Sequence, residues 1–166
     1  FASPYAWTKA TNTDLVINYG KWFGIPYAIT YFYNVYGPRE IRDGEYATVV
    51  AKFTKSMKEQ KNLTVVSPGT QERNFTHVYD IIDGLILIGK HAIGDEFGIG
   101  NSEAYSILDL AELFGGKIEI IPERDGNRMT ADLITEKTER LGWKPKYDLK
   151  SYISEIREKN WNIDEI

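Results

Sequence analysis

The run of residues 27–33, Tyr-Ala-Ile-Thr-Tyr-Phe-Tyr, constrains the fold of this chain more than any other segment. It is short, almost continuously apolar and rich in β-branched and aromatic residues, and it follows a long helical pattern that stops at Gly24. Such a run is typical of a strand that is buried on both faces of a parallel sheet. We therefore expect a layered α/β fold built around this strand.

The rest of the chain alternates between helical and strand patterns, which also favours an α/β fold. Ser3 and Pro4 suit the start of a helix that runs to residue 23, and its two apolar stripes predict burial on two sides. Residues 34–45 are expected to form a loop. Further helices are expected at 47–59, 78–86, 107–114, 135–141 and 149–159, and further strands at 63–66, 74–76, 96–99 and 117–121.

The composition excludes several classes of protein. With 42% hydrophobic and 27% charged residues, the 166-residue chain is globular rather than disordered and is long enough to bury a core. A formal net charge of −4 gives no support to nucleic-acid binding, and no apolar stretch approaches the length of a membrane span. The absence of cysteine excludes disulfides and thiolate metal sites and agrees with a cytoplasmic location. Because the chain begins with Phe1, we expect it to be cut or truncated at its start.

Tyr5 and Lys9 are the first candidates for chemistry. They are four residues apart on the predicted first helix, which places their side chains on one face with Cβ atoms about 5–6 Å apart. A tyrosine hydroxyl next to a lysine ammonium can exchange protons with an alcohol or a ketone. The pattern alone is weak, because about one Tyr-x-x-x-Lys match is expected by chance in a chain with 11 tyrosines.

Four further segments follow this pair in a specific order. Tyr31-Phe32-Tyr33-Asn34-Val35-Tyr36-Gly37-Pro38-Arg39 ends the apolar strand, and Gly69-Thr70-Gln71-Glu72-Arg73-Asn74-Phe75-Thr76-His77-Val78 comes next. Pro122-Glu123-Arg124-Asp125-Gly126 and Leu141-Gly142-Trp143-Lys144-Pro145 complete the set. Each segment is loose by itself, but together the chain resembles the extended short-chain dehydrogenase/reductase family, in particular its NAD-dependent nucleotide-sugar epimerases and dehydratases. The resemblance covers essentially all 166 residues.

The resemblance implies a fold and a domain division. The chain would be the C-terminal part of a Rossmann-like enzyme with its small α/β substrate-binding domain. Residues 1–45 would be a remnant of the NAD-binding domain, and residues 46–166 would mainly bind substrate, with some segments returning to the Rossmann core. No glycine-rich turn for the NAD pyrophosphate follows a strand, so we expect the N-terminal dinucleotide-binding half to be absent.

The resemblance also implies roles for residues around NAD. Tyr5 would be the catalytic acid and base that exchanges a proton with a sugar hydroxyl. Lys9 would hold the nicotinamide ribose and favour the phenolate form of the tyrosine. Tyr31 and Phe32 would line the nicotinamide side of the cleft.

Three more residues would bind the nucleotide sugar. Asn34 would form a hydrogen bond near the diphosphate, and Arg73 and Arg124 would clamp the diphosphate, since guanidinium binds phosphate in a bidentate manner. Without the surrounding motifs, the two arginines would more often be surface ion-pair partners, and Asn34 could simply cap a loop. His77 and His91 have no companion ligands at metal spacing, so we expect no metal site.

The intact enzyme that the resemblance implies would interconvert UDP-hexoses at C4 with tightly bound NAD, whereas the isolated chain would be inactive. A 4,6-dehydratase or a decarboxylase of the same family remains open, as does a non-catalytic module that binds nucleotide sugars or takes part in assembly. We also expect a cytoplasmic homodimer that forms through the N-terminal helix, without nucleic-acid or membrane partners.

Overall fold

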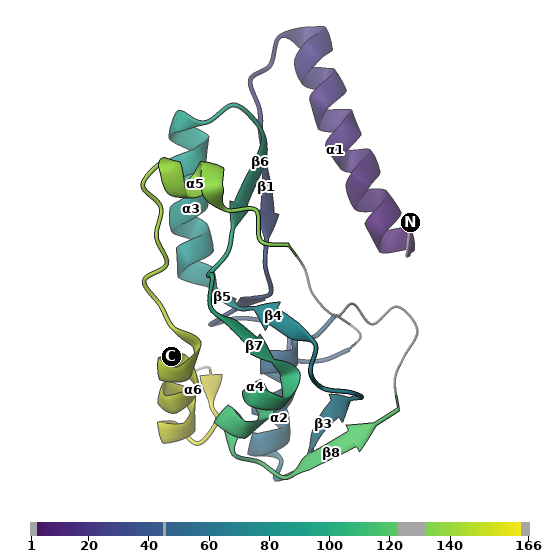
Figure 1. Cartoon of the computed structure of the whole chain (residues 1–166), viewed down its shortest axis with the longest axis vertical. Helices are drawn as coiled ribbons and strands as arrows, with labels where there is room; N and C mark the ends of the chain where they lie inside the picture. Colours follow the sequence, from purple (N-terminus) through teal and green to yellow (C-terminus); the bar gives the residue numbers. More distant parts are fainter. Residues whose placement is uncertain (1–2, 45, 123–131, 164–166) are drawn as a thin grey trace.

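The fold divides into an upper and a lower group of elements in Figure 1, a computed structural model that describes residues 3–44, 46–122 and 132–163. The two groups are joined by the short parallel pair of β2 and β5, in which Val35 lies opposite Thr76. This pair connects the end of β1 to the start of α3. Strand β2 spans Val35–Tyr36, and strand β5 spans Thr76–His77.

The upper group is built on two parallel strands. β1 pairs with β6, and Thr30 and Phe32 lie opposite Phe97 and Ile99. One side of this pair packs against α3, whose side chains at 81 and 88 join Phe97 and Ile99 in a small core. The bounds are Ala28–Phe32 for β1, Gly94–Ile99 for β6, Val78–His91 for α3 and Glu136–Arg140 for α5, which lies beside β6.

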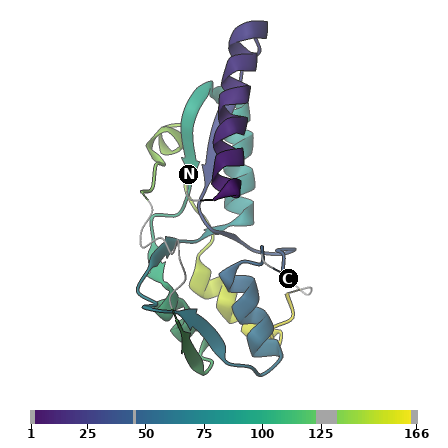
Figure 2. The ribbon, with the colours of Figure 1, turned by 90° about the vertical axis from the view of Figure 1, so that its right-hand side faces the viewer.

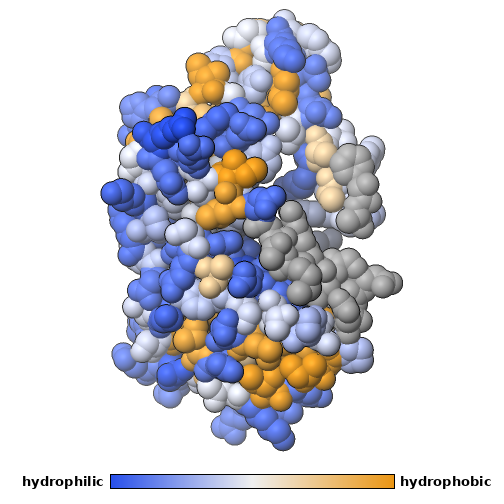
Figure 3. Space-filling model, in the orientation of Figure 1, coloured by the Kyte–Doolittle hydropathy of each residue, from blue (hydrophilic) through white to orange (hydrophobic). Residues whose placement is uncertain are grey.

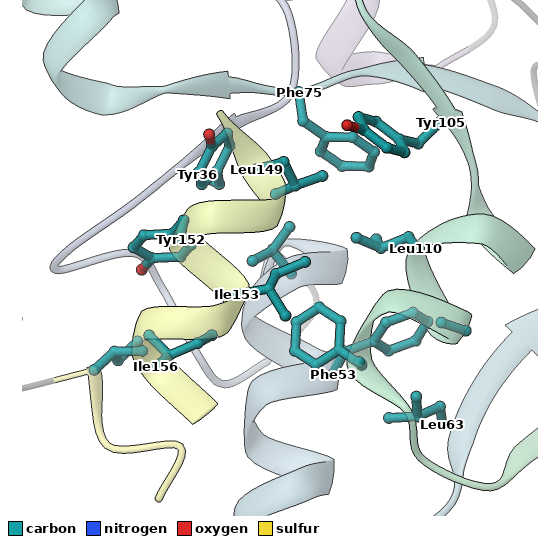
Figure 4. Packing of buried hydrophobic residues seen from close by; sticks show 14 of the residues in the cluster. Tyr36, Phe53, Leu63, Phe75, Tyr105, Leu110, Leu149, Tyr152, Ile153 and Ile156 are labelled. Atoms are coloured by element: carbon teal, nitrogen blue, oxygen red, sulfur yellow. The ribbon is translucent and has the colours of Figure 1, made fainter. Parts of the chain in front are cut away.

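The lower group holds the larger core. Three helices face one another there, and Figure 4 shows Phe53, Leu110 and Ile153 meeting between them. Strand β3 runs parallel to β8 beside this core, and β4 pairs antiparallel with β7. The bounds are Val49–Lys58 for α2, Ile107–Phe114 for α4, Leu149–Glu158 for α6, Leu63–Val66 for β3, Ile118–Ile121 for β8, Glu72–Asn74 for β4 and Ala104–Ser106 for β7.

Helix α1, Pro4–Phe23, differs from all the other long helices. The side chain of Ser3 accepts a hydrogen bond from Ala6 N–H, and Gly24 ends the helix with φ of 64°. None of its residues is buried. In Figures 1 and 2 it extends from the upper group, and apolar side chains show on its surface in Figure 3. The prediction that this helix is buried on two sides is therefore wrong.

The burial of the apolar strand also differs from the expectation. β1 is a parallel strand, as predicted, but Tyr31 and Phe32 at its end are 40% and 49% exposed. The prediction of burial on both faces is wrong because α3 covers one face while α1 does not close over the other. The remaining predicted helices and strands are confirmed within a few residues, with two exceptions. The helix at 78–86 extends to His91, and the single strand predicted at 74–76 is wrong, because that range covers the end of β4 and the start of β5 with Phe75 between them. Strands β2 and β7 were not predicted.

Candidate functional site

Tyr5 and Lys9 lie on neighbouring turns of α1, as the spacing predicts. The ammonium of Lys9 is 5.5 Å from the centre of the Tyr5 ring, and the Tyr5 side chain is 65% exposed. Among the described residues, no hydrogen bond or ion pair joins either side chain to another group. The pair is thus preformed on the helix and open to a ligand.

Tyr31 and Phe32 lie at the carboxyl end of β1. The Tyr31 hydroxyl donates a hydrogen bond to Asp95 Oδ1 at 2.9 Å. Burial, and after it this hydrogen bond, raises the pKa of Tyr31 to about 12, so its phenol stays protonated at neutral pH. Phe32 offers an exposed ring at the same strand end. The described structure contains no hydrogen bond between these strand residues and Tyr5 or Lys9.

Asn34 and Arg73 are brought together in one hollow, although 39 positions separate them in the sequence. Asn34 has φ of 37°, and its amide donates to the Asn74 carbonyl oxygen at 3.2 Å, which holds the turn after β1 against β4. Arg73 lies on β4 opposite Tyr105, and its Nη1 donates to the Glu72 carbonyl oxygen at 2.7 Å. We call this space, of about 500 Å³, the central hollow.

The alternation of β3 explains where the central hollow lies. Leu63 and Val65 point into the lower core, so Thr64 and Val66 point to the opposite side, where they line the hollow. Lys52 of α2 contributes an ammonium group to the same space. Three further aliphatic side chains complete the lining, namely Val49, Ile107 and Ile121.

Gln71 is a lining residue of the central hollow that sequence reasoning missed. Its side chain is 4% exposed, and its Nε2 donates to the Val66 carbonyl oxygen at 3.1 Å, which fixes the orientation of the amide. Its Oε1 is buried without a hydrogen-bond partner, so it is an unused acceptor beside the hollow. Gly69, with φ of 80°, makes the turn before it, and a Cβ there would lie 2.6 Å from Leu108. The available sequence signal was its position just after the turn at Gly69, two residues before Arg73.

Arg124, the other predicted diphosphate ligand, lies outside the described residues. Within the described part of the chain, no group of His, Asp and Glu side chains could hold a metal ion. The helices of that part also include none that is long and apolar enough to cross a membrane.

The lining of the central hollow favours an anionic ligand that is also partly apolar. Lys52 and Arg73 provide positive charge, and guanidinium forms strong charge-assisted bonds with phosphate. Thr64, Asn34 and Gln71 provide donors and acceptors between aliphatic walls. A few polar groups in a mainly apolar hollow of this size are typical of small-molecule sites.

Comparisons with known proteins identify the family. The profile of the NAD-dependent epimerase/dehydratase family matches residues 2–100. An uncharacterized UDP-glucose epimerase of Bacillus subtilis is 38% identical over 67% of this chain and 34% of its own length. UDP-glucuronic acid decarboxylase 5 of Arabidopsis thaliana is 37% identical over 86% of this chain and 43% of its own length. This chain belongs to the NAD-dependent epimerase/dehydratase family.

Solved structures agree with this assignment. The UDP-glucose 4-epimerase of Thermotoga maritima, solved with UDP-glucose, has a TM-score of 0.86 at 26% identity. The match covers 95% of this chain and 54% of the epimerase chain. The UDP-glucuronic acid 4-epimerase of Bacillus cereus, solved with UDP-glucuronic acid and NAD, has a TM-score of 0.83 at 29% identity, over 99% of this chain and 53% of its own. The chain therefore spans about a third to a half of its relatives' length.

The cofactor of the family is NAD. The exposed Tyr5 hydroxyl and the Lys9 ammonium lie on the same face, and such groups bind the hydroxyls of a ribose. The exposed ring of Phe32 suits contact with a flat ring. The types of these groups are compatible with a ribose and a flat ring.

Proposed function

We propose that the chain is part of an NAD-dependent nucleotide-sugar epimerase that interconverts UDP-hexoses at C4. The observation that carries this proposal is the central hollow, which combines Asn34, Arg73 and the unpartnered oxygen of Gln71 between aliphatic walls. Membership of the epimerase/dehydratase family and the similarity to UDP-sugar enzymes support it.

In this proposal the central hollow holds the nucleotide diphosphate. Arg73 and Lys52 neutralise phosphate charge, and Arg124 adds a second guanidinium. Asn34 donates a hydrogen bond near the diphosphate, and Gln71 Oε1 accepts one from the nucleoside. An anchor on the nucleotide leaves the sugar free to turn over without leaving the enzyme.

Tyr5 and Lys9 supply the proton chemistry. As the phenolate, Tyr5 takes the proton of the C4 hydroxyl while the hydride leaves C4. It returns that proton to the ketone oxygen after the sugar has turned, when the hydride comes back to the opposite face of C4. The ammonium of Lys9 stabilises the phenolate and holds the ribose, while Tyr31 and Phe32 line the nicotinamide side. When bound, NAD would supply the hydride chemistry at the sugar carbon.

A calorimetric titration with UDP-glucose tests the binding part of this proposal. We expect saturable binding by the chain, weakened about tenfold to a hundredfold in Arg73→Ala, because a charge-assisted hydrogen bond is lost. Arg140→Ala is the matched control, since Arg140 is an exposed arginine on α5 that pairs with Glu136. Equal affinity of both variants, or no saturable binding, contradicts the assignment of the central hollow.

An activity assay tests the catalytic part. We propose that the chain alone does not epimerise UDP-glucose with added NAD and gains turnover when the glycine-rich half of a homologous epimerase is added in trans. Turnover with Tyr5→Phe in the complemented enzyme would contradict the role of the hydroxyl. A chain that binds UDP-glucose but gains no turnover would instead be a non-catalytic binding or assembly module.

A decarboxylase is the second candidate, because the Arabidopsis relatives are UDP-glucuronic acid decarboxylases. A 4,6-dehydratase of the same family is a third. Production of UDP-xylose from UDP-glucuronic acid by the complemented enzyme would identify the decarboxylase.

We also propose that the protein is a cytoplasmic homodimer that forms through α1. The exposed apolar side chains of this helix include Trp7, Leu15 and Trp22.

A further inference from the structure

A second hollow, which the proposed function does not use, lies between the start of α3 and helix α6. It has a volume of about 380 Å³, and we call it the aromatic hollow. Its lining residues that matter for a ligand are His77, Tyr79, Tyr147, Asp148, Tyr152 and Glu155.

The walls of the aromatic hollow are ring faces and edges. The rings of His77 and Tyr147 stack with centres 4.4 Å apart, and Tyr79 meets Tyr147 in a T-shaped arrangement at 5.8 Å. Tyr79 and Tyr147 are 47% and 44% exposed, so their rings are open to a ligand. The faces of such rings attract cations and flat cationic groups.

The floor carries a hydrogen-bond donor. His77 is 4% exposed, and its Nδ1 accepts a hydrogen bond from Tyr79 N–H at 3.2 Å. Because Nδ1 accepts, the proton of the neutral ring is on Nε2. Burial lowers the pKa of His77 and keeps the ring neutral. Among the described residues Nε2 has no hydrogen-bond partner, and it faces Gly37, next to Pro38 of the lining, so this N–H group can donate to an acceptor that enters on that side.

The rim has excess negative charge. Asp148 and Glu155 contribute carboxylates, and the ammonium of Lys146 on the same rim is held 2.5 Å from a third carboxylate, Asp83. Glu155 binds Lys159 through Oε1 at 3.1 Å, and no described residue forms a hydrogen bond with its Oε2. The rim is therefore complementary to a cation.

We propose that the aromatic hollow binds an arginine side chain that a partner protein presents in an extended peptide segment. The guanidinium is flat, so it can stack on the exposed ring of Tyr79, whose plane is inclined by 62° to that of Tyr147, while it donates hydrogen bonds to Glu155. A backbone carbonyl of the same segment accepts the hydrogen bond of His77 Nε2. This inference is independent of the nucleotide-sugar assignment, because the two hollows share no lining residue.

A titration with a blocked pentapeptide, acetyl-Gly-Ala-Arg-Ala-Gly-amide, tests the proposal. Its control is the same peptide with citrulline, which has the shape of arginine without the charge. We expect saturable calorimetric binding of the arginine peptide at about millimolar concentration and about tenfold weaker binding of the citrulline peptide.

Protein variants locate the binding. Glu155→Gln and Tyr79→Ala change exposed side chains, and each should weaken binding of the arginine peptide by about threefold to tenfold. Tyr46→Ala is the matched control, because Tyr46 is 77% exposed and does not line the hollow. Absence of saturable binding, equal affinity for both peptides, or equal effects of Tyr46→Ala and Tyr79→Ala would overturn the proposal.

Discussion

Helix α1 and the lower group of elements contain similar apolar side chains but use them differently. In the lower group, α2, α4 and α6 each bury three or four residues, and their aromatic rings meet in one core. In α1, by contrast, none of 20 residues is buried, although Trp7, Tyr19 and Trp22 lie on its surface. An apolar stripe therefore indicates a surface that can be covered, and burial requires a partner of matching shape. The proposed substrate residues lie beside the packed group, and the proposed catalytic pair lies on the unburied helix.

Substitution of two phenylalanines should give the largest difference in stability loss between these regions. Phe53 is 2% exposed in the lower core and Phe23 is 65% exposed at the end of α1. We expect Phe53→Ala to lower the free energy of unfolding by about 3–5 kcal/mol, because it leaves a cavity, and Phe23→Ala to change it by about 0.5 kcal/mol at most. Urea unfolding followed by circular dichroism measures both. Similar losses in the two variants would mean that α1 is packed as tightly as the core.

Glu40 makes the stability of the lower group depend on pH. Its Oε2 accepts a hydrogen bond from Thr48 at 2.6 Å, and its Oε1 is buried without a hydrogen-bond partner. Burial outweighs the hydrogen bond of Thr48 and the charge of Arg42, and it raises the pKa of Glu40 from 4.5 to about 7. The folded protein thus holds this proton more tightly than the unfolded chain does.

The sign of the pH effect follows from that raised pKa. The protonated Glu40 carboxyl contributes on the order of 3 kcal/mol to the free energy of unfolding. This contribution is fully present below about pH 4.5 and is lost as the pH rises through about 7. Chemical unfolding at a series of pH values should therefore show a decrease in stability over this window. Glu40→Gln cannot ionise and should remove this part of the pH dependence. An unchanged pH profile in that variant would contradict the buried carboxyl.

Two serine caps give the smallest expected effect. Ser106 caps α4 in the lower group, and Ser3 caps α1, each through its side-chain oxygen. We expect Ser106→Ala to lower the global free energy of unfolding by about 1 kcal/mol. Ser3→Ala should instead speed amide hydrogen exchange in the first turns of α1 and leave the global value unchanged. A fall in global stability with Ser3→Ala would show that α1 unfolds together with the lower core.

The elements that could be predicted from the sequence have local signals. Ser106 before an apolar period and Gly115 after it define α4, and both ends agree with the structure. The short strand β2 has no such signal, because Val35 becomes a strand residue only by pairing with Thr76, which is 41 positions away. The prediction that residues 27–33 are buried on both faces failed for a related reason, since burial depends on whether another element covers the strand.

The candidate site was predictable to a similar degree. The ordered motifs indicated Asn34 and Arg73, and the structure places both on the central hollow. Gln71 lies in the same motif, but only the fold shows that Val66 holds its amide nitrogen and leaves the oxygen without a partner. The aromatic hollow could not be predicted, because Tyr79 and Tyr147 meet only through the packing of α3 beside the segment before α6.

Asp80, in the first turn of α3, has a consequence for how the molecule unfolds. Its two carboxylate oxygens accept the backbone N–H groups of Lys146 and Tyr147 at 2.9 and 3.1 Å, and its side chain is buried. Helix α3 belongs to the upper core, whereas Lys146 and Tyr147 lead directly into α6 of the lower core. If either core melts, the other loses hydrogen-bond partners for a buried charge, which is costly. We therefore expect this single carboxylate to couple the two cores thermodynamically, so that they denature in one cooperative transition.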